Sequence, residues 1–288
     1  MTEVANLSEA MRRCLERVYR VARDISGASA EAWLSSQVVQ AEAYDHAMSD
    51  LAFYGDTWAP IYDEMHAHLD PTAAVEVLAA LAGSGRALEL GIGTGRVAIP
   101  LAERGVDVRG IEVSEAMLHR MRAKPGGAGI PVTLGDFTDV AVDGEYSLIY
   151  VVFSTLYGLL AQDAQVACVR NAAARLAFGG VFVVESFVPD PARFERDQRV
   201  QVTRIEATRL DLLLARHDPI SQRVTSQYVV AGTSGMQLYP VEVRYVWPSE
   251  LDLMAKLAGL RLRDRWGDWH RGRYTGAGTH VSVYELAT

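Results

Sequence analysis

This sequence has few cysteines, no excess of positive charge and no long apolar run. Its two cysteines, Cys14 and Cys168, lack the paired spacing of a zinc site or a disulfide framework, which predicts a reduced, cytoplasmic protein. Lys and Arg number 28 against 36 Asp and Glu, a formal net charge of −8, so we expect neither nucleic acid nor an anionic membrane as partner. No apolar run approaches the ~20 residues of a membrane span. Charges interrupt the N-terminal region where a signal peptide needs its apolar stretch, so secretion is not expected.

The composition is that of a globular protein. The chain has 288 residues, 49% of them hydrophobic and 22% charged, which is enough to bury a full core. Apolar residues at three- and four-residue spacing predict an amphipathic helix over 7–25, which packs on its own domain or forms a homodimer contact. Further helices are expected over 30–52 and 71–81. We therefore predict a helical N-terminal extension, or lid, over 1–70.

The middle of the chain alternates short apolar segments rich in β-branched residues with helical stretches. Strands are expected over 87–90, 106–113, 130–136, 146–153 and 180–187, and helices over 96–104, 114–123 and 161–177. Strand and helix alternating at this spacing predict an α/β fold, with a parallel Rossmann-like sheet covered by helices on both faces.

The pattern changes after this region. Period-two alternation, broken by Asp-Pro and Gly-Thr-Ser-Gly, predicts an inserted antiparallel meander over 194–247. A helix over 248–257 and strands over 260–266 and 279–286 then complete the core sheet. The expected domains are an extension over 1–70, a core over 71–193, the meander over 194–247 as an acceptor cap, and core completion over 248–288.

The most informative segment is Leu-Glu-Leu-Gly-Ile-Gly-Thr-Gly-Arg at 88–96, where a strand ends and a helix begins. Glycines in such a turn let the backbone approach a ligand closely. A dinucleotide site favours Gly or Ala at the sixth motif position, where this chain has Arg96. Glu89, at the strand end, repels a pyrophosphate but can pair with an ammonium. Glu112 closes the next strand, where an acidic residue commonly holds the ribose hydroxyls, a placement that NAD folds share. The segment therefore favours a cofactor that carries an amino acid.

These residues resemble the class I S-adenosylmethionine (SAM) dependent methyltransferases. The resemblance covers about 70–190 and 248–288. It rests on four motifs in order: Glu89 to Gly95, Glu112 with Ser114, Gly135-Asp136-Phe137, and the turn Leu176-Ala177-Phe178-Gly179-Gly180. It implies a seven-stranded sheet whose last strand runs antiparallel, and SAM as cofactor with S-adenosylhomocysteine (SAH) as product.

The resemblance also implies roles for individual residues. Tyr62 is similar to a tyrosine of the lid that contacts SAM in related enzymes. The other expected contacts with SAM are Glu89, Gly91, Gly93 and Gly95 beside its methionine half, Glu112 on the ribose, Asp136 on the adenine amino group, Phe137 against the adenine ring, and Phe153 with Ser154 facing the sulfonium.

The acceptor is expected to be a small natural product. The segment 151–155 lacks the Asn/Asp-Pro-Pro-Tyr/Phe motif of amino-group DNA methyltransferases, and neither cysteine follows a proline, as cytosine C5 enzymes require. An aromatic or heterocyclic metabolite suits the aromatic residues of the lid and meander, with transfer to N, C or O left open. The expected acceptor contacts are Tyr54, Trp58, Tyr239, Arg244 and Trp269.

Methyl transfer needs a base only when the acceptor keeps its proton. Glu185 and His270 are the predicted catalytic groups, with His66 and His217 as further candidates, and no ligand cluster requires a metal. Two other functions remain open: a SAM-binding protein without turnover, and a nicotinamide-dependent oxidoreductase.

Overall fold

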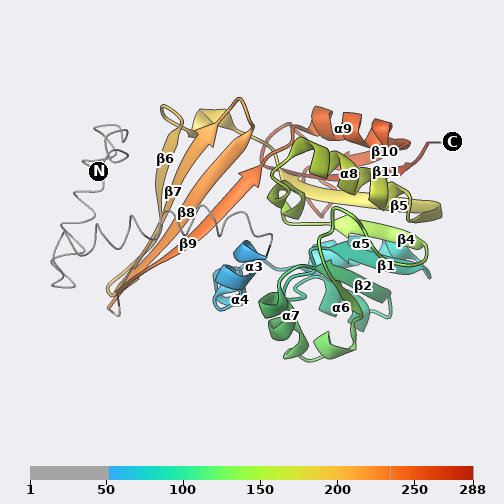
Figure 1. Cartoon of the computed structure of the whole chain (residues 1–288), viewed down its shortest axis with the longest axis horizontal. Coiled ribbons are helices and arrows are strands. Elements are labelled where there is room, and N and C mark those ends of the chain that lie inside the picture. Colours follow the sequence, from blue (N-terminus) through green and yellow to red (C-terminus); the bar gives the residue numbers. More distant parts are fainter. Residues whose placement is uncertain (1–51, 234, 288) are drawn as a thin grey trace. The chain divides into compact units, whose positions relative to one another are not determined.

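The computed structural model describes residues 52–233 and 235–287 (Figure 1). These residues form two compact units, one of 200–214 with 227–239, the other of 52–199, 215–226 and 240–287. The helix predicted over 7–25 with its dimer contact, and the one over 30–52 except its last residue, lie outside the described residues.

The larger unit is built on a seven-stranded sheet in the order β10-β11-β5-β4-β1-β2-β3. The strands are β1 (Arg86–Leu90), β2 (Asp107–Glu112), β3 (Val132–Leu134), β4 (Tyr146–Val151), β5 (Leu176–Phe187), β10 (Leu260–Trp266) and β11 (Thr279–Leu286). β11 pairs antiparallel with both β5 and β10, and the remaining pairs are parallel. The predicted α/β fold, with its antiparallel last strand, is confirmed.

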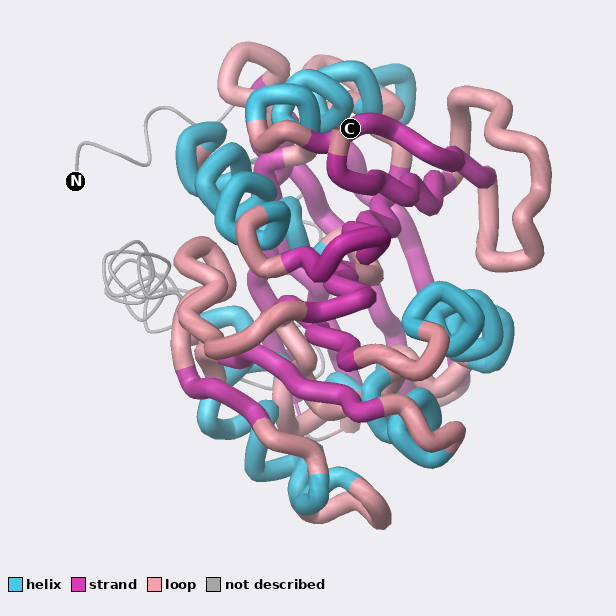
Figure 2. The backbone as a smooth tube through the Cα atoms, turned by 90° about the vertical axis from the view of Figure 1, so that its right-hand side faces the viewer, coloured by secondary structure: helices cyan, strands magenta, loops and turns pink. Residues whose placement is uncertain are grey.

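Helices lie on both sides of this sheet (Figure 2). They are α5 (Thr72–Ala82), α6 (Ala98–Glu103), α7 (Glu115–Arg122), α8 (Gln162–Ala173) and α9 (Pro248–Leu257). Successive residues of β4 face opposite layers, because Ile149 and Val151 belong to the core under α8 and α9 while Leu148 and Tyr150 belong to the core under α5 and α6. Burial on both faces explains why the strand sequences are apolar runs without alternation. Among the described helices, none is both long and apolar enough for a membrane span.

The direction of winding reverses between β1 and β4. From β1 the chain continues outward to β2 and β3, and it then returns to β4, on the other side of β1, and continues to β5. Ligands of open α/β sheets bind in the crevice at the carboxyl ends of the strands at this switch point. Glu89 and Phe153, from the two neighbouring strand ends, therefore face one crevice.

One boundary prediction was wrong. The helix predicted over 161–177 ends at Ala173, and the segment expected as a turn before the fifth strand is the bulged start of β5. The pairing with β4 jumps from Tyr146↔Leu176 to Leu148↔Val181, so β5 carries extra residues at this point. Gly180 permits the bulge, since a Cβ there would lie 2.8 Å from the Tyr146 carbonyl oxygen.

The predicted meander is also present. It is a four-stranded antiparallel sheet in the order β6-β7-β8-β9, formed by β6 (Gln198–Glu206), β7 (Arg209–Asp218), β8 (Arg223–Gly232) and β9 (Gly235–Arg244). Neighbouring strands follow one another in sequence, as expected for hairpins joined by short turns.

Candidate functional site

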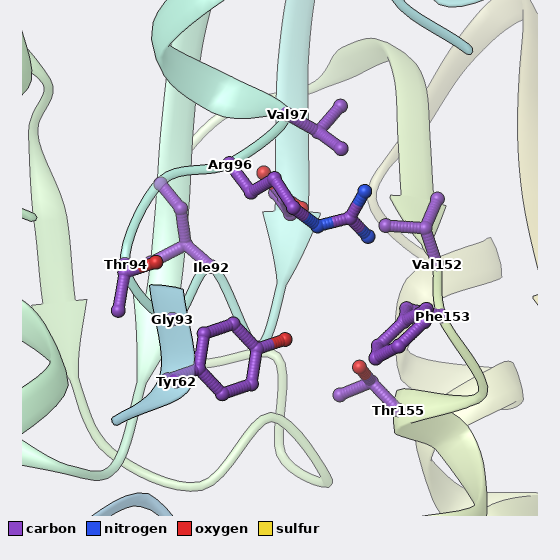
Figure 3. A pocket seen from close by; sticks show the side chains of 11 residues that line it. Tyr62, Ile92, Gly93, Thr94, Arg96, Val97, Val152, Phe153 and Thr155 are labelled. Atoms are coloured by element: carbon purple, nitrogen blue, oxygen red, sulfur yellow. The ribbon is translucent and has the colours of Figure 1, made fainter. Parts of the chain in front are cut away.

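A pocket opens at the switch point, between the ends of β1 and β4 (Figure 3). It is lined by Tyr62, Glu89, Gly91, Ile92, Gly93, Thr94, Arg96, Val97, Val152, Phe153 and Thr155. These residues come from a short helix, α4 (Tyr62–Met65), from the end of β1 with its glycine loop, and from the segment after β4. Of the predicted site residues, Tyr62, Glu89, Gly91, Gly93 and Phe153 therefore line one pocket.

The glycine loop holds a conformation that ordinary side chains rarely adopt. Gly93 has φ +56°, and a Cβ there would meet no atom within 4 Å, so it borders open space. Gly95 has φ +77°, and a Cβ there would lie 2.7 Å from Met121 Cγ. Gly93 therefore leaves room for a ligand, whereas Gly95 lets the loop pack on α7.

Glu89 is a buried carboxylate at the pocket. It is 3% exposed, and its Oε2 accepts a hydrogen bond from the Tyr150 hydroxyl at 3.0 Å. Burial raises the pKa of Glu89 to about 8, although Tyr150 and the positive charge of Arg96 act in the opposite direction. A buried carboxylate of this kind is stabilised by a cation and repels a phosphate.

Glu112 stands beside the same loop at the end of β2. Its Oε1 accepts the backbone N–H groups of Val113 and Ser114, both at 3.0 Å, and its Oε2 accepts that of Gly93 at 2.8 Å. Burial raises the pKa of Glu112, and these N–H groups oppose that shift. Each carboxylate oxygen has two lone pairs, so Oε2 keeps one for a ligand hydroxyl.

Two carboxylates of the segment that contains α3 (Phe53–Trp58) and α4 form hydrogen bonds to neighbouring loops. Asp63 Oδ1 accepts hydrogen bonds from Thr94 Oγ1 and Lys124 Nζ, each at 2.7 Å. Although burial opposes ionisation, these two bonds lower the pKa of Asp63. Asp56 Oδ1 accepts the Ser114 hydroxyl at 2.6 Å. The α3–α4 segment is therefore bonded to both the β1 and the β2 loops, which places Tyr62 against the pocket.

Two aromatic rings, those of Tyr62 and Phe153, also line the pocket. Phe153 has φ +57°, and its N–H donates to Glu185 Oε2 at 2.8 Å. The Arg96 guanidinium carbon lies 4.9 Å from the centre of the Phe153 ring, a cation–π contact. Burial raises the pKa of Tyr62 to about 12, so its hydroxyl stays protonated. In Figure 3 the side chains of Tyr62 and Arg96 extend toward the side that holds Phe153.

Three further predicted residues, Phe137, Asp136 and Glu185, are not among those that line the pocket. Phe137 lies near the glycine loop, since a Cβ on Gly91 would be 3.6 Å from its ring. Asp136 Oδ1 accepts the Thr138 N–H at 2.9 Å, so this carboxylate also stabilises a local turn. Glu185 contacts the pocket wall indirectly, because its Oε2 accepts the backbone N–H of Phe153.

The predicted acceptor contacts of the α3–α4 segment and of β9 lie outside the pocket lining. Trp58 is 2% exposed and donates its indole N–H to the Pro240 carbonyl at 2.9 Å, while the Tyr54 ring lies 5.7 Å from it and is 40% exposed. Arg244 is buried, and its guanidinium pairs with Glu250 at 2.8 Å and donates to Gln165. Tyr239 is buried, and its hydroxyl donates a hydrogen bond to Gln237 Oε1 at 2.8 Å.

Trp269 and His270, the predicted site residues between β10 and β11, are also not among the residues that line the pocket. Trp269 packs against the core under α5 and α6, and His270 is exposed in the connection between β10 and β11, where its N–H donates to Asp268. The described residues contain no group of three or more His, Cys, Asp or Glu able to hold a metal.

Two features of the site were not predicted from the sequence. Arg96 contributes to the pocket wall, although its motif position signals only a departure from dinucleotide sites. Asp63 bonds the α3–α4 segment to the glycine loop, and its only signal is that it follows Tyr62 directly.

Comparison with known proteins identifies the family. A family model described as "Methyltransferase domain" matches residues 87–180. The CcbJ methyltransferase from Streptomyces caelestis is 39% identical, with a TM-score of 0.79 covering 83% of this chain and 100% of CcbJ. The cypemycin N-terminal methyltransferase of a Streptomyces species is 26% identical over 245 residues, 82% of this chain and 98% of that protein.

A more distant structure shares the fold. CalS10, an amino pentose methyltransferase from Micromonospora echinaspora solved with SAM bound, is 22% identical with a TM-score of 0.59, covering 77% of this chain and 96% of CalS10. Because the identity to CcbJ extends over most of both chains, this protein belongs to the class I SAM-dependent methyltransferases, and S-adenosylmethionine is its cofactor.

Proposed function

We propose that this methyltransferase transfers a methyl group to an amine nitrogen of a small, aromatic or heterocyclic natural product. The choice of nitrogen is supported by the cypemycin N-terminal methyltransferase, which matches most of this chain. A nitrogen acceptor also demands the weakest base, and the described pocket wall carries a protonated Tyr62 rather than a phenolate.

The buried carboxylate of Glu89 is the observation that carries the cofactor assignment. The pKa of Glu89 is raised to about 8 because burial destabilises the ionised carboxylate more than its neighbours stabilise it. The ammonium of the SAM methionine half would supply the positive charge that stabilises the ionised form. The open position at Gly93 and the remaining lone pair of Glu112 fit the backbone approach and a ribose hydroxyl. The donor set of the pocket is therefore chemically suited to SAM and unsuited to a pyrophosphate.

The other end of the pocket is proposed to hold the reacting groups. SAM supplies a methyl group activated by its sulfonium. The Tyr62 and Phe153 rings would lie against that cation, which aromatic faces attract, and the Arg96 guanidinium would bind the methionine carboxylate. Asp136 and Phe137 are proposed to contact the adenine, in line with the family resemblance.

Glu185 is proposed as a positioning residue for Phe153. Its Oε2 already accepts the Phe153 N–H, and this bond supports a left-handed backbone conformation that costs about 1–3 kcal/mol. A carboxylate fixed in this way orients the aromatic wall. The acceptor roles of Tyr54, Trp58, Tyr239, Arg244 and Trp269, and a catalytic role for His270, stay predictions.

The test is transfer of labelled methyl from SAM to matched acceptors. Small aromatic and heterocyclic compounds would be offered in pairs, one bearing a primary or secondary amine and the other a hydroxyl at the same carbon. We expect label only on the amine member, located on nitrogen by mass spectrometry. Label on the hydroxyl member or on a ring carbon would contradict the proposal.

A further inference from the structure

His66 lies in contact with two rings that line the pocket. Its imidazole meets the Phe153 ring edge to face, with centroids 5.0 Å apart at 86°, and its centroid is 4.4 Å from that of Tyr62. Its Nδ1 is 2.8 Å from the Tyr62 carbonyl oxygen. A carbonyl only accepts, so Nδ1 carries the proton and Nε2 carries the lone pair. Within 52–233 and 235–287, no hydrogen bond occupies this Nε2.

The charges around His66 favour its neutral form. Burial lowers the pKa of His66, the positive charges of Arg96 and His68 lower it further, and the Tyr62 carbonyl and the Asp63 carboxylate oppose them. Glu185 faces the same region, because it accepts the N–H of the ring partner Phe153. His66 is therefore an available proton acceptor near neutral pH.

Other described histidines are placed differently. The Nε2 of His217 is 2.9 Å from the Tyr245 hydroxyl, and His217 stacks on Phe194 at 4.8 Å. His280 is fully buried within β11 with Nδ1 2.9 Å from the Ser282 hydroxyl, and His270 is exposed. Of these side chains, only His66 contacts the pocket wall.

We propose that His66 is the general base of the transfer, accepting through Nε2 a proton from the acceptor nitrogen. The inference rests on the proposed amine acceptor. An aliphatic amine enters from water mostly as an ammonium, which has no lone pair. The proton passes from nitrogen to Nε2, and the freed pair forms the bond to the methyl carbon. The carbon–sulfur bond breaks with its electron pair going to sulfur, and the imidazolium returns its proton to water after release.

Sinefungin tests this without an identified acceptor, because it carries a primary amine on carbon in place of the methylsulfonium. SAH has the same methionine half and no such amine. Ionisation of Glu89 changes the affinity for both ligands equally, so it does not change the ratio of the two affinities. That ratio therefore depends only on the groups around the position of the transferred methyl. Calorimetric titration between pH 5 and 8 with wild type, His66→Gln and His68→Gln gives this ratio. His68 is the matched control, since it is an exposed histidine two residues away.

In wild type we expect sinefungin to lose about tenfold in affinity relative to SAH as pH falls from 8 to 5, because imidazolium repels the sinefungin ammonium. His66→Gln should give a constant ratio, whereas His68→Gln should keep the wild-type fall with its midpoint at a slightly higher pH, because a positive charge near His66 is removed. A wild-type ratio that does not change with pH, or a fall that persists in His66→Gln, overturns the role of His66 while SAH binding leaves the cofactor assignment intact. Failure of wild type to bind SAH overturns the function on which the inference rests.

Discussion

Replacement of Glu89 by glutamine removes the carboxylate assigned to the SAM ammonium. With a pKa of about 8, Glu89 is roughly one-tenth ionised at pH 7 and about three-quarters ionised at pH 8.5. Binding of an ammonium requires the ionised form, so SAH should bind about eightfold more tightly at pH 8.5 than at pH 7, with release of about 0.9 proton at pH 7. Glu89→Gln should lose this pH dependence, and at pH 8.5 it should bind SAH about 2 kcal/mol, or roughly thirtyfold, more weakly.

Calorimetry in buffers of different ionisation enthalpy measures both affinity and proton release. Tyr150→Phe provides the matched control, because it deletes the hydroxyl that donates to Glu89 at 3.0 Å and leaves the ring in place. Without that donor the pKa of Glu89 should rise, so the pH at which SAH affinity reaches its plateau should move up by about one unit. Wild-type affinity independent of pH, or a Glu89→Gln variant that keeps the wild-type slope, would show that Glu89 does not bind the ammonium.

Five further variants test the pocket. Glu185→Gln should keep turnover within about threefold, because an amide oxygen still accepts the Phe153 N–H, whereas Glu185→Ala should lose about tenfold or more; equal losses would instead indicate a base. Gly93→Ala should weaken SAH binding at a modest cost in thermal stability, while Gly95→Ala, whose Cβ meets α7, should mainly lower the melting temperature; the reverse order would contradict the assigned roles. Asp63→Asn loses an ion pair, so SAH should bind several-fold more weakly, most clearly at low salt, and unchanged binding would exclude this fastening role.

The sequence alone could predict that Glu89 and Glu112 lie near one another at one edge of the sheet. In a parallel sheet the carboxyl ends of adjacent strands share one edge, so Glu89 and Glu112 could be assigned to the same crevice from their strand positions alone. The pocket contains Glu89, and Glu112 binds its loop through the Gly93 N–H. Order along the chain therefore predicts which groups meet at a strand edge.

Features that depend on distant partners were not accessible. Arg244 suggests an acceptor contact by its type and place, yet it is buried against Gln165, 79 residues earlier in the chain. The bulge in β5 depends on how the segment at 176–180 approaches β4, which periodicity does not report. Likewise, the tautomer of His66 follows from a carbonyl contact that only the folded backbone provides.

Titration of the purified full chain with SAH and, separately, with NAD distinguishes a SAM site from a dinucleotide site. The glycine motif is common to both cofactor classes, but at pH 8.5 Glu89 is mostly ionised, and its buried carboxylate then attracts an ammonium and repels a pyrophosphate. We predict micromolar binding of SAH and no binding of NAD by calorimetry. Binding of NAD with equal or greater affinity, or of neither ligand, would contradict the account.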